Sequence, residues 1–161
     1  MIVVSNTSPI ISMAAIGQLN LLQQLYNQII IPTAVYDEIA NAGKTDVGAA
    51  AVQTLSWIKT QQVTDYSPIG SFPKRLNAGE NEAIALAIEL NADLLLIDEK
   101  LGRKVARSSG LKLTGVLGIL MAAKRRGLIP VVKLLMDDLI AQVGFRVSTE
   151  LYAEILQQVG E

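Results

Sequence analysis

Short apolar runs alternate along the chain with longer segments whose apolar residues recur every three to four positions. The short runs are rich in Val, Ile and Leu, which is typical of buried strands, and they fall at residues 2–5, 28–32, 58–63, 92–98 and 111–115. The segments between them have the period of amphipathic helices. Because strands alternate with helices, the pattern predicts βαβ units and a parallel sheet covered by helices on both faces.

Residues that start or stop helices divide this pattern. Pro9 is suited to open the first helix with Ser8 as its N-cap, and Asn77 is placed to cap the helix that follows it. The helix after the second strand is expected to stop at Gly43. Residues 64–75 contain two Pro and one Gly, which predicts the longest loop of the chain.

The last third of the chain carries mainly helical patterns, at residues 116–127, 130–144 and 148–159. A chain of 161 residues, 50% of them hydrophobic, suits one compact domain. We therefore expect a single α/β domain over residues 1–161, with a central parallel sheet between helical layers and a helical C-terminal extension over residues 115–161. No apolar run approaches the roughly 20 residues of a membrane span, and no signal peptide is recognisable, which predicts a cytoplasmic protein.

Helical spacing separates the acids of residues 79–89 into an inward and an outward group. Glu80 precedes Ile84 by four residues and Ile88 by eight, so it lies on the apolar face of its helix. Glu82 shares its face with Glu89, which is typical of a solvated side. The pattern therefore predicts that Glu80 points toward the core and that Glu82 does not.

A second inward acid is expected in the helix that begins at Thr33. Glu38 lies inside an apolar stripe, whereas Asp37 falls beside it; the stripe consists of Ala34, Val35, Ile39 and Ala42. A carboxylate inside such a stripe is costly to bury unless another group pairs with it. Glu38 is therefore a candidate for a site rather than for a solvated surface.

Two polar residues, Asn6 and Asp98, follow predicted buried strands directly. Ligands of open α/β sheets bind at the carboxyl ends of the strands. Together with Glu38 and Glu80 these residues supply only oxygen ligands, three of them acidic, which suits Mg²⁺ or Mn²⁺. Each acid alone also fits a helix cap, a surface charge or an ion pair, and Glu80 near a helix N-terminus is stabilised by the helix dipole without any function.

Composition restricts the chemistry further. The chain has neither Cys nor His, which excludes disulfides, Cys/His zinc sites, thiol nucleophiles and Ser–His or Cys–His catalysis. The formal net charge is -1, so any nucleic-acid contact needs a local basic surface. One candidate has helical spacing directly after Asp98 and consists of Lys100, Arg103, Lys104 and Arg107; a second cluster spans residues 124–126. Such stripes are also common on solvated helix faces.

Four segments, taken jointly and in order, resemble a known family: "VVSNTSPIISMAAIGQLNLL", "IPTAVYDEIA", "LNAGENEAIALAIELNADLLLIDEKLGRKVA" and "LTGVLGILMAAKRRGLIP". They resemble the PIN-domain superfamily of metal-dependent ribonucleases, and within it a prokaryotic branch related to VapC-type toxins. The resemblance implies a PIN-like three-layer α/β/α fold and an endoribonuclease that uses Mg²⁺ or Mn²⁺. It also implies RNA as substrate, a small antitoxin protein as a possible partner and a homodimer.

The resemblance places the four metal ligands of the family at Asn6, Glu38, Glu80 and Asp98, with Glu38, Glu80 and Asp98 as the catalytic acids. Thr7 and Ser8 match hydroxyl positions beside the first ligand. The chain departs from the family at Asn6, where most active members have Asp. An amide oxygen coordinates a cation but brings no negative charge, so weaker metal binding is expected.

Three functions therefore remain open at this stage. The first is a PIN-type endoribonuclease, which depends on Glu80 and Asp98. The second is a catalytically impaired PIN-like module that binds RNA or protein, which the amide at Asn6 favours. The third is a phosphotransfer or phosphatase domain built around Asp98; it ranks last because it would require an Asp nucleophile at the position of Asn6.

Overall fold

The computed structural model describes residues 1–41 and 47–161. Its centre is a sheet in the order β3-β2-β1-β4-β5, in which every neighbouring pair is parallel. The strands are β1 (Val3–Ser5), β2 (Ile29–Pro32), β3 (Ile58–Gln61), β4 (Leu94–Leu96) and β5 (Leu113–Thr114). The predicted alternation of strands and helices is confirmed, because every strand is followed by at least one helix before the next begins.

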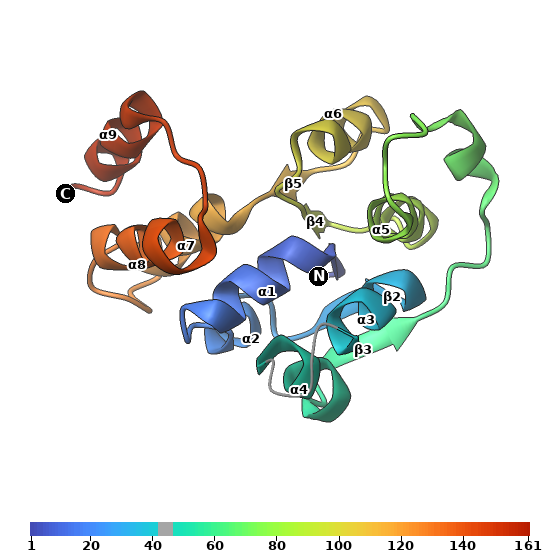
Figure 1. The fold of residues 1–161 in the computed structure, drawn as a ribbon, viewed down its shortest axis with the longest axis horizontal. Helices are drawn as coiled ribbons and strands as arrows, with labels where there is room; N and C mark the ends of the chain where they lie inside the picture. Colours follow the sequence, from blue (N-terminus) through green and yellow to red (C-terminus); the bar gives the residue numbers. More distant parts are fainter. Residues whose placement is uncertain (42–46) are drawn as a thin grey trace.

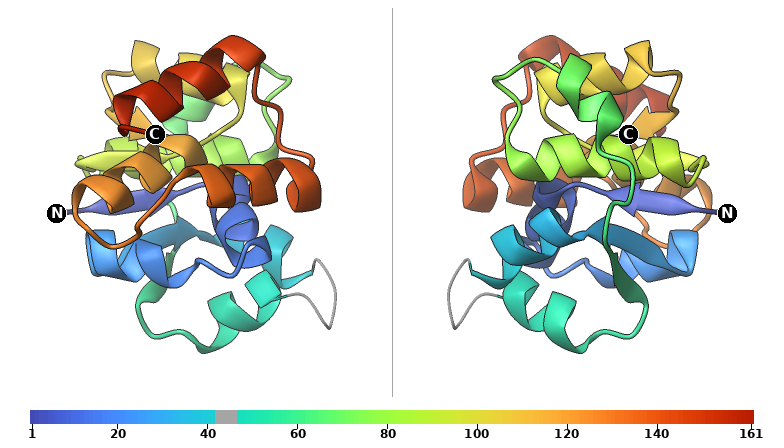
Figure 2. Two further views of the ribbon diagram at one scale, coloured as in Figure 1. Left: turned by 90° about the vertical axis from the view of Figure 1, so that its left-hand side faces the viewer. Right: turned by 90° about the vertical axis from the view of Figure 1, so that its right-hand side faces the viewer.

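Helices cover both faces of the sheet and give the expected PIN-like three-layer α/β/α arrangement (Figures 1 and 2). On one face α5 contacts β1, β2 and β4. Helices α2 and α7 contact each other; α2 packs on β2, and α7 packs on β5. The helices are α1 (Thr7–Ala15), α2 (Asn20–Tyr26), α3 (Thr33–Ala40), α4 (Val47–Thr54), α5 (Ala78–Glu89), α6 (Lys100–Ser108), α7 (Val116–Arg125), α8 (Lys133–Asp138) and α9 (Thr149–Gln158). In Figure 1, α9 lies beside α7, at the end of the molecule opposite the short 3-10 helix η1 (Ser67–Ser71).

The centre of the core is formed by β1, β4 and α5. Val4 and Leu95 are paired in register and are both fully buried, and the body of α5 from Ala83 to Ala87 is buried on all sides. Strands buried on both faces need continuous apolar sequence, which explains why these segments lack the alternation of half-exposed strands. The polar residues that follow β1 and β4 therefore lie at the edge of a rigid, dry core.

The ends of the helices agree only in part with the sequence predictions. Asn77 caps α5 as predicted, and its side chain accepts a hydrogen bond from the N–H of Glu80 at 2.8 Å. The prediction that Ser8 caps the first helix is wrong: α1 begins at Thr7 with Asn6 as its N-cap, so Pro9 is the third residue of the helix. The stop predicted at Gly43 lies outside the described residues.

The C-terminal region differs from the expected single helix over residues 130–144. Here α8 continues into a π-helical turn, Leu139–Val143, which ends at Gly144 with a left-handed φ of 70°. Glycine adopts this conformation without the steric penalty of a side chain, so it ends the helix before the chain turns toward α9. Among the described residues no helix is both long and apolar enough to cross a bilayer.

Candidate active site

The parallel pairing of β1 with β4 brings Asn6 and the chain before Asp98 to one edge of the sheet. Ser5 pairs in register with Leu96, and the N–H of Asn6 donates to the carbonyl of Leu96 at 2.9 Å. Asp98 follows β4 by two residues. The sheet topology therefore places both polar residues at the carboxyl ends of its two central strands, where parallel sheets form their sites.

Two oxygen atoms at this edge are buried and have no partner among the described residues. Asn6 is 2% exposed, and its Oδ1 accepts no hydrogen bond from residues 1–41 or 47–161. Within the same ranges Asp98 accepts one hydrogen bond, from the N–H of Val116 to Oδ1 at 3.0 Å, whereas its Oδ2 is buried and accepts none. Buried polar atoms nearly always find a partner, so two unsatisfied acceptors at adjacent strand ends indicate a place for a cation or a hydrogen-bond donor.

Glu38 reaches this edge from α3 and is held in a defined position. Its Oε2 accepts a hydrogen bond from the hydroxyl of Thr7 at 2.6 Å, and its Oε1 accepts one from the N–H of Gly79 at 3.0 Å. A Cβ atom at position 79 would lie 2.5 Å from Oε1, so any residue other than glycine there would displace the Glu38 carboxylate from this position. The acid predicted inside the apolar stripe therefore has polar partners, although Ala42 of that stripe lies outside the described residues.

Glu80 points toward the core, as its helical position predicted, and is 7% exposed. Its Oε1 lies 3.5 Å from the N–H of Asn77 and completes a capping box, while its Oε2 faces Gly102 of α6. Burial raises the pKa of Glu80, the N–H of Asn77 lowers it, and the charges of Glu99 and Glu38 raise it again, so that the net shift is upward. Glu80 is thus part of a helix cap, and the negative charges of nearby acids disfavour its ionised form.

The pKa of Asp98 is raised, like that of Glu80. Burial raises the pKa of Asp98, the N–H of Val116 and the charge of Arg103 lower it, and Glu99 raises it, with a net upward result. Arg103 is half-buried and donates from Nη1 to the carbonyl of Ile97 at 3.1 Å. Both charges are therefore partly shielded from water. Their electrostatic interaction is stronger here than it would be at an open surface.

Glu99 is a fourth acid at this edge, and the sequence patterns did not indicate it. It accepts a hydrogen bond from the hydroxyl of Ser8 at 3.0 Å, and its charge raises the pKa of both Glu80 and Asp98. Thr7 and Ser8, the two hydroxyls expected near the first ligand, thus bind Glu38 and Glu99 respectively. The only sequence signal for Glu99 is its position next to Asp98.

The prediction that Glu82 lies on a solvated face is wrong. Glu82 is half-buried, and its Oε1 accepts a hydrogen bond from the N–H of Ala34 at 3.2 Å, in the first turn of α3. Glu89, on the same predicted face, accepts hydrogen bonds from the N–H groups of Thr64 and Asp65 at 2.9 and 2.8 Å. Both acids therefore satisfy backbone donors of other segments, which helical periodicity does not reveal.

The basic residues of α6 do not act as one uniform stripe. Lys100, Lys104 and Arg107 are exposed, whereas Arg103 turns back toward Ile97 and Asp98. Burial and the charge of Arg107 lower the pKa of Arg103, and Asp98 raises it. The helix thus presents three cations to solvent and one cation to the acidic edge.

The donor set fits a hard divalent cation in its chemistry, since all four predicted ligands present oxygen atoms and two of these atoms have no partner. Within residues 1–41 and 47–161, however, no three acidic side chains come close enough together to form a ready metal site. The charges of Glu99 and Glu38 raise the pKa of Glu80, and the charge of Glu99 also raises the pKa of Asp98, so Glu99 is the acid that acts on both. Mutual repulsion between ionised acids opposes closer approach unless a cation offsets it.

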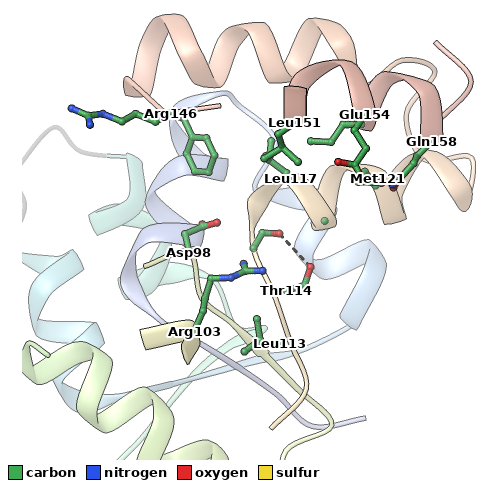
Figure 3. A pocket seen from close by; sticks show the side chains of 14 residues that line it. Asp98, Arg103, Leu113, Thr114, Leu117, Met121, Arg146, Leu151, Glu154 and Gln158 are labelled. Atoms are coloured by element: carbon green, nitrogen blue, oxygen red, sulfur yellow. Dashed lines mark hydrogen bonds between the residues drawn. The ribbon is translucent and has the colours of Figure 1, made fainter. Parts of the chain in front are cut away.

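A pocket of about 470 Å³ opens beside Asp98 and Arg103 and extends between α7 and α9 (Figure 3). Figure 3 shows Asp98 and Arg103 at one side of this pocket, with Leu117 and Met121 of α7 facing Leu151, Glu154 and Gln158 of α9. Gly115 borders the same place, and a Cβ there would overlap the carboxylate of Asp98. Of the acids at this edge, Asp98 is the one that lines the pocket, whose volume suits a small ligand.

Comparison with known proteins agrees with this architecture. The solved structure of a PilT N-terminus domain protein from the hyperthermophilic archaeon Sulfolobus solfataricus P2 is similar, with a TM-score of 0.56 and 21% sequence identity over 76% of this chain and 93% of that chain. At this identity the similarity shows the fold alone. No curated protein matches the chain. The family model DUF3368, described as a PIN domain, matches residues 2–161, and the chain therefore belongs to the PIN-domain family.

Proposed function

We propose that this protein is a metal-dependent endoribonuclease of the PIN type. The observation that carries the proposal is the pair of buried, unpartnered oxygen atoms, Oδ1 of Asn6 and Oδ2 of Asp98, at the carboxyl ends of adjacent strands. PIN domains are usually nucleases and generally use divalent metals, and such ions bind oxygen atoms of this kind. Buried acceptors nearly always bind a donor, an ordered water or a cation, and a divalent ion would satisfy both of these atoms at once.

Asn6, Glu38, Glu80 and Asp98 would hold the Mg²⁺ or Mn²⁺ ion. When bound, the ion supplies Lewis-acid activation of water and charge neutralisation at the scissile phosphodiester. The hydroxyl of Thr7 and the N–H of Gly79 fix the orientation of the Glu38 carboxylate. The raised pKa values of Glu80 and Asp98 mean that the fold disfavours their ionised forms, and a nearby cation would stabilise those forms.

RNA would approach over α6. Lys100, Lys104 and Arg107 are exposed on this helix and suit contacts to phosphates along the strand. Arg103 differs, since it lies beside Asp98 and would contact the phosphate nearest the acids. Because contacts between these cations and phosphates release counterions, we expect binding to weaken steeply as salt concentration rises.

An impaired PIN-like module that binds RNA or protein without cleaving it is the second candidate. It is favoured by Asn6, which provides a neutral oxygen where most active members of the family have a carboxylate. The two candidates differ in one result: the nuclease cleaves RNA in the presence of Mn²⁺, and the impaired module binds RNA but leaves it intact.

The test is to titrate the purified protein with Mn²⁺ and Mg²⁺ while following cleavage of a mixed RNA. We expect cleavage that EDTA abolishes and that Glu80→Gln or Asp98→Asn reduces by about 100-fold or more, the loss typical of removing a group that stabilises transition-state charge. Metal-independent cleavage, or equal activity in these variants, would refute the nuclease proposal. Binding without cleavage at any metal concentration would select the impaired module.

Neighbouring acids on α3 supply a matched control. Glu38 contacts Thr7 and Gly79 at the acidic edge, whereas the neighbouring Asp37 is exposed to solvent. Glu38→Gln should therefore reduce cleavage strongly, and Asp37→Asn should leave it unchanged. Both substitutions remove one negative charge from the same helix, so a difference between them cannot arise from net charge.

A small antitoxin protein as partner and a homodimer as the assembly are part of the same proposal. Co-expression with the product of an adjacent reading frame, followed by co-purification, tests the antitoxin. Light scattering of the purified chain tests the homodimer, which is the commonest closed assembly of soluble proteins.

A further inference from the structure

We propose that the pocket between α7 and α9 binds one nucleotide unit of an RNA strand, with its base held between the two helices. This inference rests on the proposed nuclease function and adds a binding subsite to it. The pocket borders Asp98 and Arg103, so the nucleotide that occupies it would be next to the phosphodiester at the acidic edge.

The walls of the pocket have the apolar character that a nucleobase face requires. Leu117 and Met121 project from α7, and Leu151 projects from α9 on the facing side (Figure 3). Leu117 and Met121 are only half-buried, and Leu151 is 39% exposed, so these side chains offer apolar surface that the fold itself leaves open. A planar base inserted here would bury that surface on both of its faces.

Polar groups lie where the edges of a nucleotide would be. Glu154 and Gln158 face the pocket from successive turns of α9, and the amide of Gln158 donates to the carboxylate of Glu154 at 3.2 Å. A carboxylate and an amide supply acceptors and a donor for the edge of a base. At the other end Arg103 extends toward Thr114 beside Asp98, which suits a phosphate (Figure 3).

The size of the pocket fits a single unit. Its volume is about 470 Å³, within the roughly 300–1,000 Å³ of sites that hold one small ligand. Sites of this kind combine apolar walls with a few convergent polar groups, which is the composition found here. Among the described residues that line the pocket, Phe145 is the one aromatic side chain, so aliphatic side chains would supply most of the contact that aromatic stacking gives at many RNA-binding surfaces.

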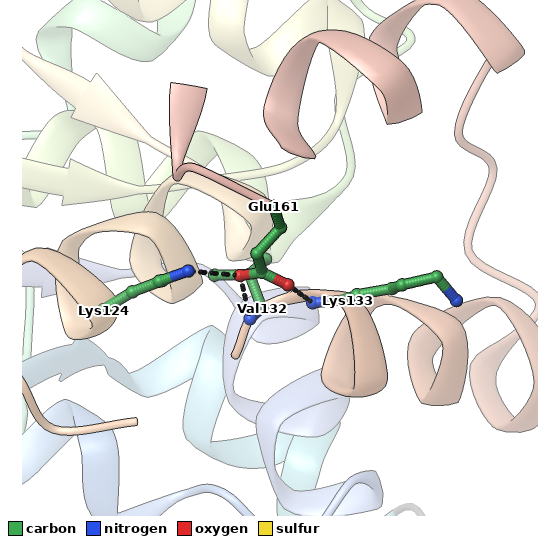
Figure 4. Close-up of polar contacts among 4 residues, drawn as sticks. All are labelled: Lys124, Val132, Lys133 and Glu161. Carbon is green, nitrogen blue, oxygen red and sulfur yellow. Dashed lines mark hydrogen bonds and ion pairs between the residues drawn. The ribbon is translucent and has the colours of Figure 1, made fainter. Parts of the chain in front are cut away.

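The α9 wall is fixed to the rest of the protein at its C-terminal end. The carboxylate of Glu161 accepts hydrogen bonds from Nζ of Lys124 at 2.8 Å, from the N–H of Val132 at 2.7 Å and from the N–H of Lys133 at 3.0 Å (Figure 4). Lys124 belongs to α7, the opposite wall of the pocket. The residue that follows the α9 wall is therefore bonded directly to the last turn of the α7 wall.

Methionine methyl groups provide a direct probe. The chain has four Met residues: Met121 lines the pocket, Met13 and Met136 are fully buried elsewhere, and Met1 is 80% exposed. Protein labelled with ¹³C at the Met methyl groups would be titrated in EDTA with adenosine, guanosine, cytidine and uridine 5′-monophosphates. We expect a saturable shift of the Met121 signal with at least one nucleotide, while the signals of Met13 and Met136 stay in place.

Two exposed leucines allow a matched pair of variants. Leu151→Trp fills the pocket from its α9 wall and should weaken nucleotide binding about tenfold or more. Leu134 is 64% exposed on α8 and does not line the pocket, so Leu134→Trp should leave the Met121 titration unchanged. Because both leucines are at the surface, both variants are expected to fold.

The titration separates this inference from the nuclease proposal, since it needs neither a metal ion nor cleavage. A Met121 shift without RNA cleavage would support the subsite and count against the nuclease. Cleavage in Mn²⁺ with no Met121 shift for any of the four nucleotides at millimolar concentration would overturn the subsite alone. Equal weakening by Leu151→Trp and Leu134→Trp would also overturn it.

Discussion

Glu161 accepts hydrogen bonds at the start of α8, and Asp98 accepts one at the start of α7, but the two carboxylates have opposite environments. Glu161 has three donors, and although burial alone would raise its pKa, Lys124 and the N–H groups of Val132 and Lys133 lower that pKa to about 2 (Figure 4). Asp98 has one donor and one unpartnered oxygen, and its pKa is raised. The fold thus favours the ionised form of Glu161 and disfavours that of Asp98.

This difference distinguishes a structural carboxylate from candidate functional ones. The side chain of Glu161 bonds to Lys124 of α7 and to the backbone at the start of α8, and its charge stabilises the folded state. Asp98 and Glu80 are buried near other acids, which costs stability unless a further positive group approaches. The comparison therefore predicts that changing charge in the two places affects stability with opposite signs.

The largest effect is expected from adding a charge at the acidic edge. Asn6→Asp places a carboxylate at a position that is 2% exposed and has an unpartnered oxygen. Without divalent ions we expect a loss of roughly 2–4 kcal/mol in the free energy of unfolding, because the new charge is buried without a partner. Adding Mn²⁺ should restore at least half of this loss, as measured by urea unfolding.

The outcome of that measurement also bears on the metal site. If Asn6→Asp is destabilised and Mn²⁺ restores nothing, the edge does not bind the ion. Higher RNA cleavage by this variant than by the wild type would show that the neutral amide limits activity.

Removing the charge of Glu161 should have the next largest effect. Glu161→Gln keeps the size of the side chain but loses the ion pair with Lys124 and weakens the bonds to Val132 and Lys133. We expect a loss of about 1–3 kcal/mol in unfolding free energy at pH 7, the range for hydrogen bonds to charged groups. Asp37→Asn is the control, and a loss no larger than in this control would contradict the structural role of Glu161.

The same pair of proteins gives a smaller, pH-dependent effect. The folded pKa of Glu161, about 2, is below its ordinary value of 4.5, so its ionised form stabilises the fold fully above about pH 4.5. That stabilisation is lost as the pH falls from 4.5 toward 2. The stability difference between wild type and Glu161→Gln should therefore be smaller at pH 3 than at pH 7, and a constant difference would rule out this linkage.

The smallest effect is expected from Asp98→Asn, and it should have the opposite sign or none. The amide oxygen of Asn can still accept from the N–H of Val116, and the variant no longer buries a charge. We expect an unfolding free energy equal to that of the wild type or higher by up to about 1 kcal/mol, even though cleavage is lost. A destabilisation as large as that of Glu161→Gln would mean that Asp98 is a structural acid.

Sequence patterns predicted the architecture because they report burial along a single element. Continuous apolar runs identified the central strands, and alternation with helices predicted a parallel sheet. The helical period placed Glu80 on the buried face, and Asn77 was recognisable as a cap because both partners of a capping box lie within one turn. These properties depend on residues close together in the chain.

Contacts between distant segments were not predictable in the same way. Glu82 has the spacing of a solvated residue but bonds to Ala34, which is 48 residues away. Glu99 resembles a surface acid and joins the edge only because β1 and β4 are neighbours in the sheet. Arg103 has the spacing of a basic stripe, yet it turns toward the carbonyl of Ile97.

The sequence by itself determined which segments are buried and that Glu80 faces inward, since hydrophobic periodicity is a local property of each helix or strand. Only the tertiary structure decided which buried oxygens lack a donor, because a hydrogen-bond partner depends on how segments far apart in the chain meet. The proposed site rests on that second kind of fact. Oδ2 of Asp98 is an example, because segments from several parts of the chain bury this atom and none of the described residues donates a hydrogen bond to it.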